Sequence, residues 1–136
     1  MGVVVPLFGE GGGVMLPGPG KFAVEVVGVS NYQPAIEAAA RPRAAGARPL
    51  TVEAVLLLED DNPHDANAVR IEIGGAAVGY LKREHARRYR LDLEAAGHPR
   101  IVARCKARIV GGYDRGEGVR ATYGVKLDLP PFEAAP

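Results

Sequence analysis

The stretch AVRIEIGGAAVGYL, residues 68–81, decides the fold class. Apolar and charged residues alternate strictly in its first half, as in a strand with one buried face. The inward residues are Val69, Ile71 and Ile73, and the outward residues are Arg70 and Glu72. The pair Gly74-Gly75 predicts a tight hairpin turn, and Gly79 in the returning strand predicts a bulge or a close approach by another backbone. The stretch therefore predicts an antiparallel strand pair.

Four further segments outside this hairpin are rich in branched apolar residues or alternate in the same way, which predicts strands. They are FAVEVVGV (22–29), TVEAVLLLE (51–59), IVARCKARIV (101–110) and TYGVKLDL (122–129). The segment AIEAAAR (35–41) predicts one or two helical turns. Proline and glycine predict loops at 41–49 and 112–118.

The segment KREHARRYRLDLEAAG, residues 82–97, is the clearest helix. Its apolar stripe consists of Ala86, Tyr89, Leu93 and Ala96, and Gly97 is a natural stop. A different face carries Arg83, Arg87 and Arg90. The order of elements predicts a mainly β protein, a small six-stranded antiparallel barrel with one clear and one short helix. We expect a Gly/Pro-rich tail or at most one short added strand at 1–20, the barrel at 21–130 and a C-terminal tail at 131–136.

Composition sets further limits on compartment and cofactor. The 136 residues are 47% hydrophobic and 24% charged, which is ordinary for a globular domain. No apolar run approaches the roughly 20 residues that span a bilayer, and the start lacks the basic head of a secretory signal. Cys105 is the single cysteine and alternates with apolar residues, which favours a buried structural thiol. We therefore expect a cytoplasmic protein with neither disulfide, zinc site nor cofactor.

The turn DNPHDAN, residues 61–67, has two interpretations. Asn62, Pro63, Asp65 and Asn67 all suit turn geometry, so the segment could simply connect two strands. His64 is not required by such geometry, which favours a functional role for His64 together with Asp65. Acidic residues also cluster around it, and a metal-dependent nuclease using these carboxylates and Lys82 is one alternative. The cluster consists of Asp60, Asp61, His64 and Asp65.

Basic residues gather immediately after the hairpin. Residues 1–81 carry 5 basic and 9 acidic side chains, whereas residues 82–136 carry 12 basic and 7 acidic ones. Tyr80 ends a strand and a group of basic residues follows it directly. An aromatic ring that could stack on bases therefore lies next to cationic side chains that could bind phosphates. That group consists of Lys82, Arg83, Arg87 and Arg88. The alternative is a solvated basic helix face, with a protein partner engaging a strand edge or the 1–20 segment.

Residues 56–86, LLLEDDNPHDANAVRIEIGGAAVGYLKREHA, resemble the HIRAN domain, a module of helicase-like fork-remodelling proteins and of stand-alone bacterial proteins. The matching residues are Asn62, Pro63, Asp65, Asn67, Ala68, Val78, Gly79, Leu81 and Glu84. The resemblance extends over about residues 22–129 and implies an OB-like barrel. It also implies a non-enzymatic module that holds the 3′ end of single-stranded DNA in repair or processing, with a helicase or nuclease as a conceivable protein partner.

Carried over by position, the resemblance assigns roles to individual side chains. Asp65 would meet the 3′-hydroxyl, with His64 in a slot usually held by tyrosine. Tyr80 and Tyr32 would contact bases, and Arg83 would hold phosphate, continued by Lys82 and Arg87. The chain departs from the family pattern at Ser30 and Asn31, where DNA-binding members carry a basic and an aromatic residue. Asn31 then offers an amide in place of a ring.

Overall fold

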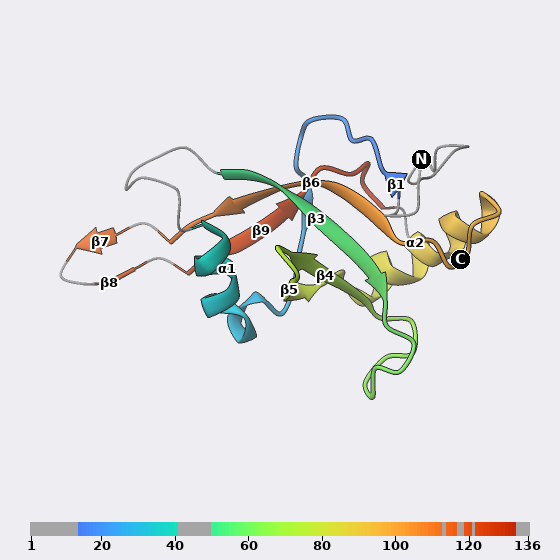
Figure 1. Ribbon diagram of the computed structural model, residues 1–136, viewed down its shortest axis with the longest axis horizontal. Coiled ribbons are helices and arrows are strands. Elements are labelled where there is room, and N and C mark those ends of the chain that lie inside the picture. Colours follow the sequence, from blue (N-terminus) through green and yellow to red (C-terminus); the bar gives the residue numbers. More distant parts are fainter. Residues whose placement is uncertain (1–13, 41–49, 113, 117–118, 121, 133–136) are drawn as a thin grey trace.

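The computed structural model describes residues 14–40, 50–112, 114–116, 119–120 and 122–132. The chain folds as a mainly β domain whose main sheet curls into a half-barrel, with α1 and α2 at opposite ends of it (Figure 1). The mainly β class predicted from the sequence is confirmed.

The main sheet has seven strands, in the spatial order β2-β9-β6-β3-β4-β5 with β1 beside β6. Its strands are β1 (Val14–Met15), β2 (Val24–Glu25), β3 (Leu50–Leu58), β4 (Val69–Ile73), β5 (Ala76–Tyr80), β6 (Ala103–Val110) and β9 (Gly124–Leu127). All pairs are antiparallel except β1 with β6. The sheet thus has one strand more than predicted, because the 1–20 segment supplies the short added strand β1.

A separate two-stranded sheet consists of β7 (Asp114–Gly116) and β8 (Val119–Arg120), which project beyond β9 (Figure 1). The sequence predicted a loop at 112–118, so this hairpin is a correction. The sequence offered no alternation to detect there, since the strands are only three and two residues long. The loop predicted at 41–49 lies outside the described residues.

Gly79 allows the two ends of the curled sheet to meet. The register of β4 and β5 shifts between Ile71 and Glu72, and Gly79 lies in β5 opposite this shift. A Cβ at Gly79 would lie 2.5 Å from the carbonyl oxygen of Val27. Val27 and Tyr80 exchange two backbone hydrogen bonds of 2.8 and 2.9 Å across this junction. Both features predicted for Gly79, a bulge and a close backbone approach, are therefore confirmed.

The strand predicted at 22–29 is shorter than expected. Only β2 and the isolated bridge at Val27 pair, although Val24 and Val26 are buried in alternation. Gly28 then takes a left-handed φ of 76° and begins a 3-10 turn, η1, at Val29–Asn31. Tyr32 follows this turn, and helix α1 (Gln33–Ala40) confirms the predicted short helix.

Helix α2 (Arg83–Ala95) confirms the long helix predicted after the hairpin. Ala86, Tyr89 and Leu93 are buried as expected, but Ala96 is exposed because it caps the helix beyond its last turn. Gly97 takes φ 81°, and the His98 amide donates to the Leu93 carbonyl, which ends the helix.

The core extends slightly beyond the barrel segment predicted at 21–130. Val14 and Leu16 are buried in it, and Phe132 packs against it. Cys105 is fully buried as predicted, and burial, with a smaller contribution from Asp128, raises the pKa of its thiol to about 12. Among the described residues, no helix is both long and apolar enough to cross a membrane.

Candidate nucleic-acid interface

The turn between β3 and β4 is built by its own side chains. Asn62 Oδ1 accepts hydrogen bonds from the amides of His64 and Asp65, at 2.8 and 3.0 Å. Asp65 Oδ1 accepts one from the Asn67 amide at 2.9 Å. These are the local side-chain to backbone bonds that asparagine and aspartate offer in turns. The side chain of His64 is exposed, so the turn presents an imidazole and a carboxylate to the surface.

Glu59, at the start of this turn, joins it to the end of β5. Glu59 Oε1 accepts from Asn62 Nδ2 and from the Tyr80 hydroxyl, both at 2.8 Å. Glu59 Oε2 accepts from Arg70 Nη1 at 2.7 Å. Burial opposes ionisation of Glu59, but these three partners outweigh it and lower its pKa. The sequence alone gives no sign of this role of Glu59, because the role depends on which partners the strand register places opposite the side chain.

Tyr32 and Tyr80 form an aromatic pair across the junction of the barrel. Their ring centroids lie 6.5 Å apart, with the planes inclined by 54°. Both rings are partly buried, and exposed Asn31 precedes Tyr32. Burial, followed by the bond to Glu59, raises the pKa of Tyr80, so its hydroxyl stays protonated and remains a donor. The pair is thus held in place at the surface, between the turn and η1.

The basic residues lie along the start of α2. Arg83 Nη2 donates to the carbonyl oxygen of His64 at 3.2 Å, so this guanidinium lies against the turn. Lys82 caps the helix without a side-chain hydrogen bond, and Lys82, Arg83 and Arg87 are all exposed. The structure therefore brings Tyr32, Tyr80, His64, Asp65 and Arg83 to one rim, with Lys82 and Arg87 continuing from it along α2.

Arg90, which the sequence pattern places only on a helix face, anchors the turn from the other side. Its Nε and Nη2 donate to the carbonyls of Asn67 and Ala68, at 2.8 and 2.9 Å, and its Nη1 to Asp60 at 2.8 Å. The other oxygen of Asp60 accepts from Arg100. Arg100 first and Arg90 second lower the pKa of Asp60 to about 2. The spacing of Arg90 along the helix gave no sign of these carbonyl partners, which come from a distant loop.

The acidic cluster noted around the turn does not converge on one point. Asp60 is paired with two arginines, and Asp65 is directed to its own turn. Among the residues with a described placement, no three His, Cys, Asp or Glu side chains gather in a way that could hold a metal ion.

Comparisons of the chain with protein-family models, with curated proteins and with solved structures each found no match.

Proposed function

We propose that the chain is a non-enzymatic, cytoplasmic module that binds single-stranded DNA, with the 3′ end of the strand at the turn 61–67, and that it acts in DNA repair or processing. One observation carries this proposal: the carboxylate of Glu59 joins the Tyr32–Tyr80 pair to the turn that presents His64 and Asp65. Arg83 lies against the same turn. Aromatic faces, a carboxylate that can accept a hydrogen bond from a hydroxyl, and cations are thus adjacent.

Each group has a chemical task in this proposal. A terminal base rests against Tyr80 or Tyr32, a contact worth roughly 1–3 kcal/mol per base. One carboxylate oxygen of Asp65 accepts a hydrogen bond from the Asn67 amide within the turn, and the other accepts a hydrogen bond from the 3′-hydroxyl. Lys82, Arg83 and Arg87 hold phosphates, and Arg83 does so from beside the turn. His64 adds an exposed imidazole, whose ring N–H can donate a hydrogen bond to a phosphate oxygen.

Fluorescence anisotropy with a labelled single strand of about ten nucleotides, within the range that one OB-type site covers, tests the proposal. The strand carries either a 3′-hydroxyl or a 3′-phosphate, and salt is varied. We expect the protein to prefer the free hydroxyl. Asp65→Asn keeps an oxygen for the Asn67 amide but removes the charge, so the turn persists while the preference is lost.

Two further variants separate end recognition from general attraction. Tyr80→Ala should weaken binding to both strands, because it removes a stacking face. Lys126→Gln removes one charge from an exposed position on β9, which does not adjoin β4 or β5, and should leave binding nearly unchanged. Equal affinity for both strand ends would refute end recognition. Absence of binding at low salt would refute the DNA proposal in favour of a protein partner, and magnesium-dependent cutting lost in Asp65→Ala would favour a nuclease.

A further inference from the structure

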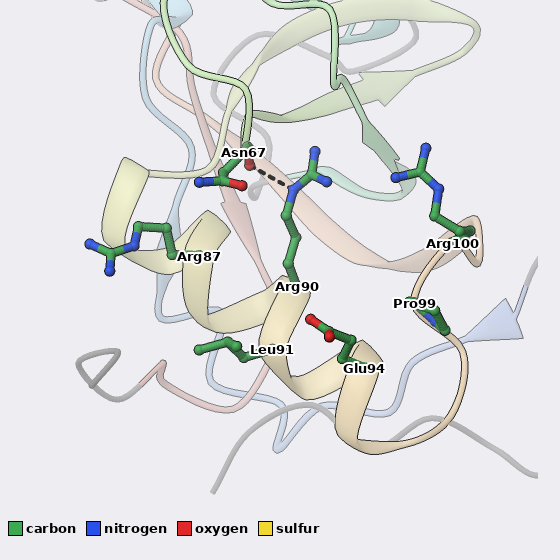
Figure 2. A pocket seen from close by; sticks show the side chains of 7 residues that line it. All are labelled: Asn67, Arg87, Arg90, Leu91, Glu94, Pro99 and Arg100. Atoms are coloured by element: carbon green, nitrogen blue, oxygen red, sulfur yellow. Dashed lines mark hydrogen bonds between the residues drawn. The ribbon is translucent and has the colours of Figure 1, made fainter.

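A pocket of about 450 Å³ lies between the second half of α2 and the turn at Pro99 and Arg100. Its lining residues are Asn67, Arg87, Arg90, Leu91, Glu94, Pro99 and Arg100. Figure 2 shows Arg90 between Arg87 and Arg100, with the Arg90 guanidinium directed at the backbone of Asn67. The lining residues carry three guanidinium groups and one carboxylate, that of Glu94, and the carboxylate of nearby Asp60 pairs with two of the guanidinium groups.

The two guanidinium groups of Arg90 and Arg100 already share one anion. Each donates to a different oxygen of the Asp60 carboxylate. A phosphodiester also offers two equivalent charged oxygens, which is why arginine pairs suit both groups. The Asp60 side chain is 48% exposed and that of Arg100 is 64% exposed, whereas that of Arg90 is only 16% exposed. Arg90 is therefore the fixed part of this arrangement, and Arg100 is the part that can turn toward a ligand.

We propose that this pocket is a second phosphate site, in which Arg100 binds one backbone phosphate of the same DNA strand, Arg87 binds a neighbouring phosphate, and Asp60 occupies Arg100 until the strand arrives. This inference rests on the proposed function and extends it to residues outside the rim. In the unbound protein Asp60 acts as an internal anion, and Arg100 exchanges the carboxylate for the phosphate. Arg90 remains bonded to Asn67 and Ala68 and keeps the site in register with the turn.

The position of the pocket favours a nucleic-acid backbone over a small free anion. Arg83, Arg87 and Arg90 follow at spacings of four and three residues, which places them on one flank of α2 in steps of about one turn, roughly 5.4 Å. The pocket thus continues the cations that begin beside the turn. Leu91 and Pro99 give it apolar surface, and Leu91 is 41% exposed. A sugar can cover such surface while its phosphate meets the arginines.

Binding of two strand lengths at several salt concentrations tests this inference. A trinucleotide reaches only the rim, whereas a strand of about twelve nucleotides also reaches the pocket. Arg100→Gln should weaken binding of the long strand several-fold and reduce the magnitude of its log–log salt slope by about 0.7, the value for one lost phosphate contact on a single strand. Binding of the trinucleotide should not change.

Asp60→Asn should act in the opposite direction, because it removes the internal charge that competes for Arg100. We expect tighter binding of the long strand and no change for the trinucleotide. Lys126→Gln removes one positive charge from β9, as Arg100→Gln removes one from the pocket, and is therefore the control for net charge. Titration with inorganic phosphate separates the two possible sources of the anion, and tight binding of free phosphate lost in Arg100→Gln would contradict a site for the strand.

The outcomes distinguish this inference from the function on which it rests. If Arg100→Gln leaves the affinity and salt slope of the long strand unchanged while Tyr80→Ala still weakens both strands, the pocket inference is wrong and the rim stands. If neither strand binds the wild-type protein, the proposed function fails, and the inference fails with it.

Discussion

The hydroxyl of Tyr80 and the side-chain amide of Asn62 donate to the same oxygen of Glu59, each over 2.8 Å. One carboxylate oxygen thus connects the end of β5 to the turn that follows β3. The hydroxyl of a second tyrosine, Tyr89, is in a different situation. Tyr89, on α2, is fully buried, and its hydroxyl has no hydrogen-bond partner among the residues that the structure describes.

Phenylalanine substitutions at these two tyrosines should therefore change stability in opposite directions. Tyr80→Phe removes a hydrogen bond to an ionised carboxylate and should lower the free energy of unfolding by about 1–2 kcal/mol. Tyr89→Phe removes a buried hydroxyl that bonds to none of the described residues and should raise the free energy of unfolding by about 1 kcal/mol. Urea unfolding of the two variants and the wild-type protein measures the sign of each change in the free energy of unfolding. A loss in Tyr89→Phe equal to that in Tyr80→Phe would show that the Tyr89 hydroxyl is bonded.

Gly79→Ala should destabilise the protein far more than Gly75→Ala. Both glycines have positive φ, 153° and 82°, so both substitutions strain the backbone. At Gly75 a new Cβ meets nothing within 4 Å, and the cost should be about 1 kcal/mol. At Gly79 it would lie 2.5 Å from the Val27 carbonyl oxygen, so the bridge must separate and the cost should exceed about 3 kcal/mol. Thermal unfolding of both variants provides the comparison.

The carboxyl of Asp60 should titrate at about pH 2, below its ordinary 3.8, in a carboxyl-detected NMR titration. Because folding lowers this pKa, the ion pairs stabilise the folded state above about pH 4, and their contribution is lost as pH falls toward 2. Arg100→Gln removes the stronger partner and should move the pKa back toward 3.8. An unchanged titration in that variant would assign the shift to Arg90 alone.

Arg90→Lys should loosen the turn, although it keeps the charge. Lysine cannot reproduce the planar fork that reaches the carbonyls of Asn67 and Ala68 and the Asp60 carboxylate together. We expect a loss of about 1–2 kcal/mol in the free energy of unfolding and altered NMR chemical shifts across 60–68. Arg87→Lys, at an exposed position one turn earlier on the same helix, is the matched control and should have almost no effect on either measurement.

Local sequence pattern predicted those parts of the fold that repeat with a fixed period. The alternation in β4, the glycine pair in its hairpin and the buried stripe of α2 were all visible, because burial imposes a period of two or 3.6 residues. The hairpin of β7 and β8 was not visible, because elements so short carry no period, and the two-residue strand β1 could be given only as a possible short strand somewhere in 1–20. The close backbone approach at Gly79 was predictable for another reason, since only glycine permits so close a contact.

The sequence singled out only part of the candidate site. His64 stood out because turn geometry does not require an imidazole, and Tyr80 because basic residues follow it directly in the sequence. Glu59 and Arg90 did not, because each bonds to atoms that are distant along the chain, Tyr80 at 21 residues from Glu59 and Asn67 at 23 from Arg90. Such partners follow from the strand register and the docking of α2, which a single sequence does not specify.

The bridge between Val27 and Tyr80 has a dynamic consequence. Two hydrogen bonds at one isolated residue pair close the junction, whereas β3 and β6 pair over seven residues. Cooperative opening of the fold should begin at this seam, and the amide protons of Val27 and Tyr80 should exchange with deuterium before those of β3. Tyr32 and Tyr80 stand on the two sides of the same seam. A molecule held between their rings would clamp it, so slowed exchange at these two amides would report occupancy of the site.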